Sequence, residues 1–183
     1  KFRELIRQVF FVLVSLSIPA IVIFISCAKE IVHVLFSQNF DRSILPLQIT
    51  APLILIVSLS SIFGFQVLSA LAKDRQILYS AIIGMSVSVV LSILLVPSLM
   101  EVGEAITILV TELSVSVSFI YFTKKYFKVG GLTNMFLKQL VGALPYIVFV
   151  IIFKSIIADS IIVLTTISII SLIWFCIYHL FIL

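Results

Sequence analysis

Apolar residues fill six long stretches of this sequence, and most charged residues lie in the short segments between them. An α-helix rises about 1.5 Å per residue and the hydrocarbon layer of a membrane is about 30 Å thick, so about twenty apolar residues can cross it. The stretches comprise residues 9–28, 43–72, 76–100, 105–123, 136–155 and 160–183. We therefore predict one transmembrane domain, 1–183, with about six spans.

The character of these stretches predicts the fold class. In lipid, backbone N–H and C=O groups must be paired, so a span is either a helix or a strand of a closed barrel. Barrel strands alternate apolar and polar residues over about ten positions, whereas these stretches are apolar on all sides and longer. We expect an all-α bundle. Charged residues make up 11% of the chain, far below the roughly 25% of globular proteins, which excludes a soluble fold.

Residues 29–42 lie between the first two stretches and form an apolar segment with charged residues at both ends. The segment is too short to cross the membrane. Amphipathic segments of this kind lie in the plane of the membrane surface. We predict an interfacial segment on the outer side; the alternative is an extension of the first helix beyond the membrane.

Basic residues predict the orientation, because Lys and Arg are enriched in cytoplasmic loops. If the chain crosses at each stretch, nine basic residues fall on one side and three on the other. The nine are Lys1, Arg3, Arg7, Lys73, Arg75, Lys124, Lys125, Lys128 and Lys138, and the three are Lys29, Arg42 and Lys154. We predict that both ends of the chain are cytoplasmic. The net charge of +4 then reflects topology and contact with anionic membrane lipids, and we expect no nucleic-acid partner.

Small side chains recur every four residues in the third stretch, at Ser80, Gly84, Ser88 and Ser92. Residues four apart share one face of a helix, and small residues on that face let a neighbouring helix approach closely in lipid. We predict a helix-packing face. The alternative is the polar lining of a water-filled path.

Glu112 is out of place, because it lies eight positions into the fourth stretch and so near the middle of the membrane. An acid at that depth is costly and usually faces protein or water. It is either a carboxylate that contacts a substrate or coupling ion, or a neutral acid hydrogen-bonded between helices. Gln66 is a weaker candidate, since an amide costs less to bury than a charge.

Enzymatic signatures are missing from the sequence. No HExxH, paired CxxC, glycine-rich phosphate loop or GxSxG motif occurs, and the acidic residues are scattered singly. We expect that the protein is not an enzyme, with no catalytic residues, no metal site and no cofactor.

Four segments occur in an order that is similar to a known family. They read KEIVHVLFSQNF, FGFQVLSALAKDRQ, LLVPSLMEVGEAITILVTELS and YFTKKYFK, within residues 20–128. Together they resemble the C-terminal part of bacterial polysaccharide flippases, the O-antigen-type exporters of the multidrug/oligosaccharidyl-lipid/polysaccharide superfamily. The residues that match the family pattern are Pro97, Gly103, Ala105, Thr111 and Glu112. Two residues depart from it, because Met100 and Glu104 stand where glycine or another small residue is usual.

The resemblance implies a two-lobed bundle of twelve to fourteen helices in the bacterial inner membrane. Such a bundle flips an undecaprenyl-diphosphate-linked oligosaccharide outward for the biosynthesis of O-antigen, lipopolysaccharide and other cell-surface polysaccharides. This chain would then be the C-terminal lobe, with membrane lipids, a missing N-terminal lobe and the polysaccharide polymerase machinery as candidate partners.

A flippase needs polar groups along the path of its substrate. Basic residues able to reach that path are Arg42 from the outer side and Lys73, Arg75 and Lys125 from the inner side; with Glu112 and Gln66 they complete the substrate-pathway candidates. Two alternatives stay open: a related multidrug or lipid exporter, and a non-transporting membrane scaffold subunit of envelope-polymer assembly.

Overall fold

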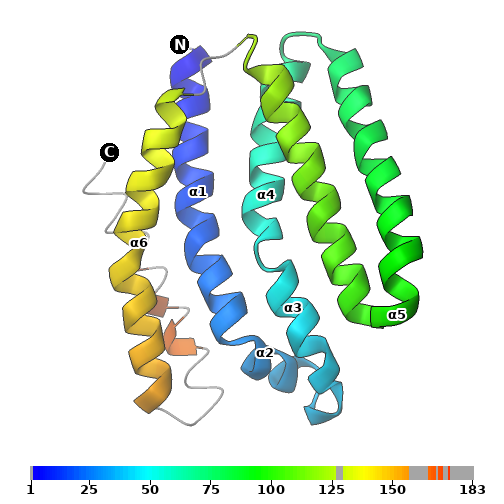
Figure 1. Ribbon diagram of the computed structural model, residues 1–183. Helices are drawn as coiled ribbons and strands as arrows, with labels where there is room; N and C mark the ends of the chain where they lie inside the picture. Colours follow the sequence, from blue (N-terminus) through cyan, green and yellow to red (C-terminus); the bar gives the residue numbers. More distant parts are fainter. Residues whose placement is uncertain (1, 127–129, 157–164, 168, 171–172, 174–183) are drawn as a thin grey trace.

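The computed structural model describes residues 2–126, 130–156, 165–167, 169–170 and 173. These residues are helical almost throughout, and no strand occurs among them (Figure 1). The elements are α1 (Phe2–Ser26), α2 (Ala28–Leu35), the 3-10 helix η1 (Gln38–Ser43), α3 (Ile44–Thr50), α4 (Leu53–Ser60), the π-helix η2 (Ser61–Ser69), α5 (Asp74–Thr123) and α6 (Gly130–Ile156). The predicted all-α fold is confirmed.

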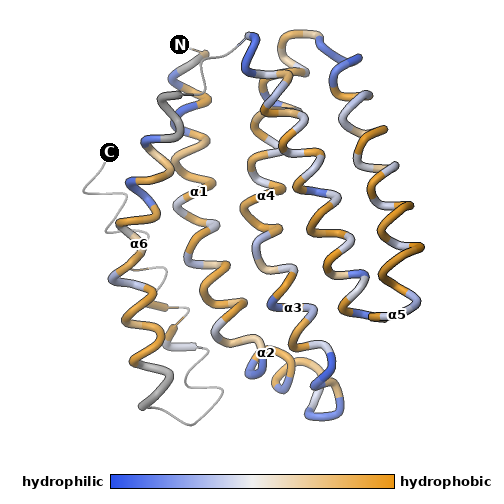
Figure 2. The backbone as a smooth tube through the Cα atoms, in the orientation of Figure 1, coloured by the Kyte–Doolittle hydropathy of each residue, from blue (hydrophilic) through white to orange (hydrophobic). Residues whose placement is uncertain are grey.

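The long helices lie side by side in a row (Figure 1). Helix α6 packs against α1, α1 packs against α3, α4 and η2, and these three pack in turn against α5. The middle of each helix is largely apolar, and polar residues gather at the two ends of the row (Figure 2). This distribution is compatible with a membrane protein, because the apolar middle matches hydrocarbon and the polar ends match the headgroups.

The main core lies between α1, η2, α5 and α6. Its buried residues are Ile6, Phe10, Val14, Ile18, Ile62, Phe63, Val67, Leu68, Phe119 and Ala143. A second, smaller cluster joins α1 to α6 around Cys27, Tyr146 and Val150.

The long helix α5 folds back on itself at Met100. This residue has φ 48° and ψ −122°, a combination that glycine adopts far more readily than other residues. Residues 74–99, which we call the first arm, therefore run antiparallel to residues 101–123, the second arm (Figure 1). Three residues beyond the reversal, Gly103 lies so close to the first arm that a Cβ atom on it would be 2.5 Å from the Leu95 carbonyl oxygen.

The predicted spans correspond to the structure as follows. Span 9–28 falls within or close to α1, spans 76–100 and 105–123 are the two arms of α5, and span 136–155 lies in α6. Among the described residues, three helices are long and apolar enough to cross a membrane, or four if one bent pair counts as a single span. The sixth predicted span, 160–183, lies almost entirely outside the described residues, so the number six stays a prediction.

The predicted span 43–72 is not one continuous helix. It is divided between Thr50 and Leu53, and the two parts, 38–50 and 53–69, meet at 42°. The division falls at Pro52, which has no N–H to donate and whose ring clashes with the preceding turn. The helix is therefore bent at this point, and the crossing of the membrane by residues 43–72 as one span stays a prediction.

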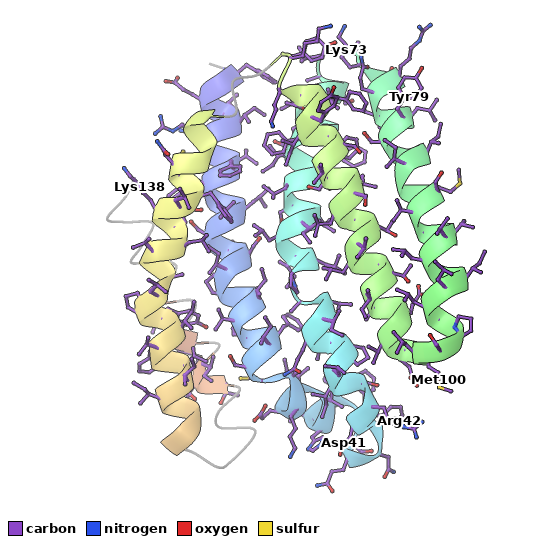
Figure 3. All side chains as sticks on the ribbon, viewed as in Figure 1. Asp41, Arg42, Lys73, Tyr79, Met100 and Lys138 are labelled. Carbon is purple, nitrogen blue, oxygen red and sulfur yellow. The ribbon has the colours of Figure 1, made fainter. Side chains whose placement is uncertain are left out.

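Residues 29–42 form separate elements of their own. Helix α1 ends at Ser26, and α2 and η1 follow at the end of the row that also holds Met100 (Figure 3). Within this region the Nε2 atom of His33 lies 2.6 Å from Oδ1 of Asp41, which joins α2 to η1. The alternative of an extended first helix is thus excluded, while placement at a membrane surface stays a prediction.

Candidate functional site

The predicted pathway residues fall at three levels of the row. Lys73, Arg75 and Lys125 lie at the end where α5 begins and ends, and Arg42 lies at the opposite end, as the labels of Lys73 and Arg42 in Figure 3 show. Gln66 and Glu112 lie between the two ends. The structure therefore brings together three of the six residues.

The reversal of α5 is what brings these three cations together. Lys73 precedes the first arm and Lys125 follows the second arm, so the hairpin returns the chain to the end from which it started. The ammonium group of Lys73 lies over the ring of Tyr126, with Nζ 5.1 Å from the ring centroid. A cation at this distance is attracted to the electron-rich face of the ring, so the two segments are held side by side.

The loop before α5 fixes the position of Lys73. Ala72 has a positive φ of 53°, and the backbone N–H of Lys73 donates to the Leu68 carbonyl at 2.9 Å. This hydrogen bond closes the end of η2, as helix ends require when they have no further turn. Lys73 is half-buried, whereas Arg75 and Lys125 are exposed.

This end of the row carries an excess of positive charge among the described residues. We call Lys73, Arg75, Lys124 and Lys125 the basic cluster; none of the four is paired with an acid in the part of the chain that the structure describes. The acid next to them in sequence is Asp74, in the first turn of α5. At a membrane edge, such lysines extend toward phosphate headgroups while their stems lie along apolar surface.

Two hydrogen bonds define how the second arm of α5 lies along the neighbouring helices. The Ser116 hydroxyl donates to the Ile56 carbonyl at 3.5 Å, and the Thr123 hydroxyl donates to the Phe63 carbonyl at 3.3 Å. Both pairs are 60 residues apart. A constant offset means that the two segments run parallel and in register.

The same register places Glu112 at the level of Pro52. Glu112 is one turn before Ser116 and therefore on the same face of the arm. Because Pro52 has no N–H, the carbonyl of Gln48 loses the donor that a continuous helix would supply. Glu112 is half-buried, and its side chain makes no hydrogen bond or ion pair with the described residues. The acid thus lies beside the break in the second predicted span.

Gln66 is not part of this arrangement. It is half-buried in η2, fourteen positions beyond Pro52 and so about 20 Å further along the helix axis. The structure therefore separates Gln66 from Glu112 and places it toward the basic cluster.

The predicted packing face is confirmed. Ser80 and Gly84 are buried, and Ser88 and Ser92 are half-buried, while most apolar residues of the first arm are exposed. A Cβ atom on Gly84 would clash with Cγ2 of Val115 on the second arm. The small residues thus face the other arm, in place of the water-filled path that was the alternative.

One polar residue was missed by the sequence analysis. Gln139 of α6 is buried, and its Nε2 donates to the Phe11 carbonyl at 2.9 Å and to Ser15 Oγ at 2.8 Å. Its Oε1 is buried without a partner among the described residues. An amide at the start of an apolar stretch was the available signal, since such a group must find partners when it is buried in lipid.

Comparisons with family models, curated proteins and solved structures find no match for this chain. In the described ranges, no group of three or more His, Cys, Asp or Glu residues could hold a metal ion. Of the polar features described above, the basic cluster, the break at Pro52 and Glu112 are the ones on which a functional argument can be built.

Proposed function

We propose that this chain belongs to a membrane flippase that moves an undecaprenyl-diphosphate-linked oligosaccharide outward across the bacterial inner membrane by alternating access. The observation that carries the proposal is the row of helices. In the described residues, α6 and the first arm of α5 occupy the two edges of the row. Extensive packing contacts join helices that are neighbours in the row and do not join the two edges to each other. Such a row surrounds no channel, so a path for a substrate needs a second lobe.

This geometry suits an amphiphilic substrate. A lipid-linked sugar has a polar head that must avoid hydrocarbon and a long tail that must stay in it. A path between two lobes is open to lipid at its sides, so the head can cross inside while the tail remains in the bilayer. We infer that the missing partner is an N-terminal lobe facing this row, and that α5 crosses the membrane twice.

Two features supply what alternating access requires. The break at Pro52 gives the second span a place to bend, since hinges are residues at the ends of elements that absorb backbone changes. Glu112 lies beside this break and bonds to none of the described residues, so it is available to contact the polar head or a coupling ion.

The orientation in the membrane follows from the charges. The basic cluster shares its end of the row with the start of α1, whereas Lys29 and Arg42 lie at the other end. By the positive-inside rule the first end is cytoplasmic. Reporter fusions after Arg75 should read cytoplasmic, and fusions near Gly103 should read periplasmic; the reverse pattern would contradict this orientation.

The transport proposal is tested in the native cell. Deletion of the gene should leave lipid-linked oligosaccharide heads on the inner leaflet, where a glycosidase reaches them only after the membrane is opened. Re-expression of the gene should restore heads that the enzyme reaches from outside. Unchanged sidedness after deletion would eliminate the flippase and favour the scaffold subunit.

The basic cluster separates this proposal from a multidrug exporter. Many drugs that such exporters remove are cationic, and unneutralised cations at the entrance would repel them. Resistance to cationic drugs that falls on deletion, with lipid-linked sugars unaffected, would instead favour the drug exporter.

A further inference from the structure

We propose that Lys73, Arg75 and Lys125 form a binding site for the phosphate groups of an anionic lipid headgroup, with Tyr126 holding Lys73 in position. The site goes beyond the transport proposal, because it requires only that this end of the row lies at a membrane surface. Its ligand class is a lipid that carries phosphate, and two sources share that chemistry: a bulk anionic phospholipid and a lipid diphosphate.

The first argument is charge. The basic cluster draws its four cations from two segments that are 50 residues apart in sequence and are brought together by α5. Among the described residues these cations have no acidic partner, and Asp74 offsets one charge of the four. A site with this net charge attracts a ligand with one or two negative charges.

The second argument is donor geometry. Arginine offers a planar fork that binds two phosphate oxygens at once, and lysine offers a mobile point charge. Arg75 on the first arm, Lys73 just before it and Lys125 just after the second arm offer both kinds of donor at the same end of the row. Exposed Arg75 and Lys125 remain accessible to a ligand, while half-buried Lys73 forms the inner wall.

The third argument is the pre-positioning of Lys73. Its Nζ lies 5.1 Å from the centroid of the Tyr126 ring, and its backbone is tied to Leu68. A lysine that is already ordered loses less side-chain entropy when it binds a ligand. The aromatic face holds the cation without neutralising it, so the ammonium group keeps donors free for phosphate.

The fourth argument is location. Exposed Tyr79 and Tyr121 lie on the two arms of α5 within two turns of its ends. Tyrosines at this depth occupy the headgroup level of a bilayer. The basic cluster then lies at the level where lipid phosphates lie.

The test measures lipid binding to the purified full chain by native mass spectrometry in neutral detergent. Phosphatidylglycerol and a polyprenyl diphosphate are titrated separately, and inorganic diphosphate is added as a competitor. The double variant Arg75→Gln/Lys125→Gln should lower the affinity for lipid phosphate about tenfold, since charge-assisted hydrogen bonds are lost. The matched control uses single variants: Lys125→Gln should lower the affinity, whereas Lys29→Gln, which removes the same charge from an exposed residue at the opposite end, should bind lipid as the unmodified protein does.

Two variants at Tyr126 isolate the positioning of Lys73 without changing charge. Tyr126→Phe keeps the ring and should keep the affinity, whereas Tyr126→Leu should lower it about threefold. Equal losses from Lys125→Gln and Lys29→Gln, or no loss from Arg75→Gln/Lys125→Gln, would overturn the site. Equal affinities of the Phe and Leu variants would overturn the role of the ring.

The two lipids identify the source of the phosphate. Tighter binding of the polyprenyl diphosphate, competed by inorganic diphosphate, assigns the site to a lipid diphosphate; equal binding of both lipids assigns it to bulk phospholipid. Because the assay measures binding alone, its result is independent of the sidedness test of transport.

Discussion

The two arms of α5 are similar in length and apolar character, yet they have different neighbours. The first arm packs along one face against the second and leaves most of its large side chains exposed. The second arm packs on the first and also on η2 and α4, to which Ser116 and Thr123 donate hydrogen bonds. In lipid, both arms satisfy the demand for an apolar surface equally well. The inner arm differs in that its hydroxyl groups also bond to helices outside the hairpin.

The turn that joins the arms should be the most sensitive point. Gly103→Val would place a Cβ atom 2.5 Å from the backbone oxygen of Leu95, which cannot move without opening the hairpin. We expect a loss of folding free energy of about 3 kcal/mol or more, measured as the yield of monodisperse protein in detergent. Leu99→Val, at an exposed position of the same turn, should leave the yield unchanged; a normal yield of Gly103→Val would contradict the closed turn.

Contact between the arms is tested at Gly84. Gly84→Leu would collide with the Val115 side chain, which can shift, so a smaller loss of about 1–3 kcal/mol is expected. The readout is the thermal unfolding midpoint in detergent. Ala81→Leu adds similar volume on the exposed side of the same arm and should have little effect. If both variants unfold alike, the edge position of the first arm is wrong.

Replacement of Met100 by glycine should stabilise the protein, whereas the two glycine substitutions above should destabilise it. Met100 has a φ of 48°, and glycine adopts this conformation without the Cβ penalty. Met100→Gly should therefore stabilise the hairpin by about 1 kcal/mol, seen as a higher unfolding midpoint. Leu99→Gly, at the preceding residue with ordinary helical backbone, should instead lower it, and the same sign for both would refute strain at Met100.

Glu112, on the inner arm, should matter little for stability and much for transport. Because no described residue is bonded to its carboxyl group, Glu112→Gln should change the folding free energy by less than about 0.5 kcal/mol. The same variant should abolish the outward movement of lipid-linked sugar. Glu104→Gln, exposed near the turn of the same arm, should leave both unchanged. Normal export by Glu112→Gln would remove Glu112 from the pathway.

Hydropathy predicts the depth of each residue in the membrane but not its neighbours. The stretches that correspond to α1, the two arms of α5 and α6 could be recognised as candidate spans, because about twenty apolar residues are required to cross lipid. Even the packing face at Gly84 could be predicted, since small residues at a four-residue spacing let a neighbouring helix approach closely. The order of helices in the row could not be predicted from the sequence, because lipid-facing and helix-facing apolar surfaces are chemically alike.

Local backbone features were harder to predict than the spans. Any of the five prolines can kink or end a helix, yet Pro19, Pro97 and Pro145 lie inside helices, and in the described residues only the region of Pro52 divides a predicted span. A proline in a helix can be accommodated by a bend, so the outcome depends on neighbouring helices. Of the predicted pathway residues, the three at the basic end could be grouped from topology, whereas the position of Glu112 beside Pro52 required the register of two helices.

The pairing of α6 with α1 has a consequence for the order of assembly during synthesis. Gln139 reaches α1 across 124 and 128 residues of chain, about twice the 60 residues that separate the second arm of α5 from its bonding partners in α4 and η2. At about 5–20 residues per second, the ribosome needs roughly 6–25 seconds to make that connection. Throughout this interval one edge of α1 is unoccupied and open to a foreign helix. Ribosome stalling before residue 139 should therefore expose this nascent protein to mispairing and to membrane quality control.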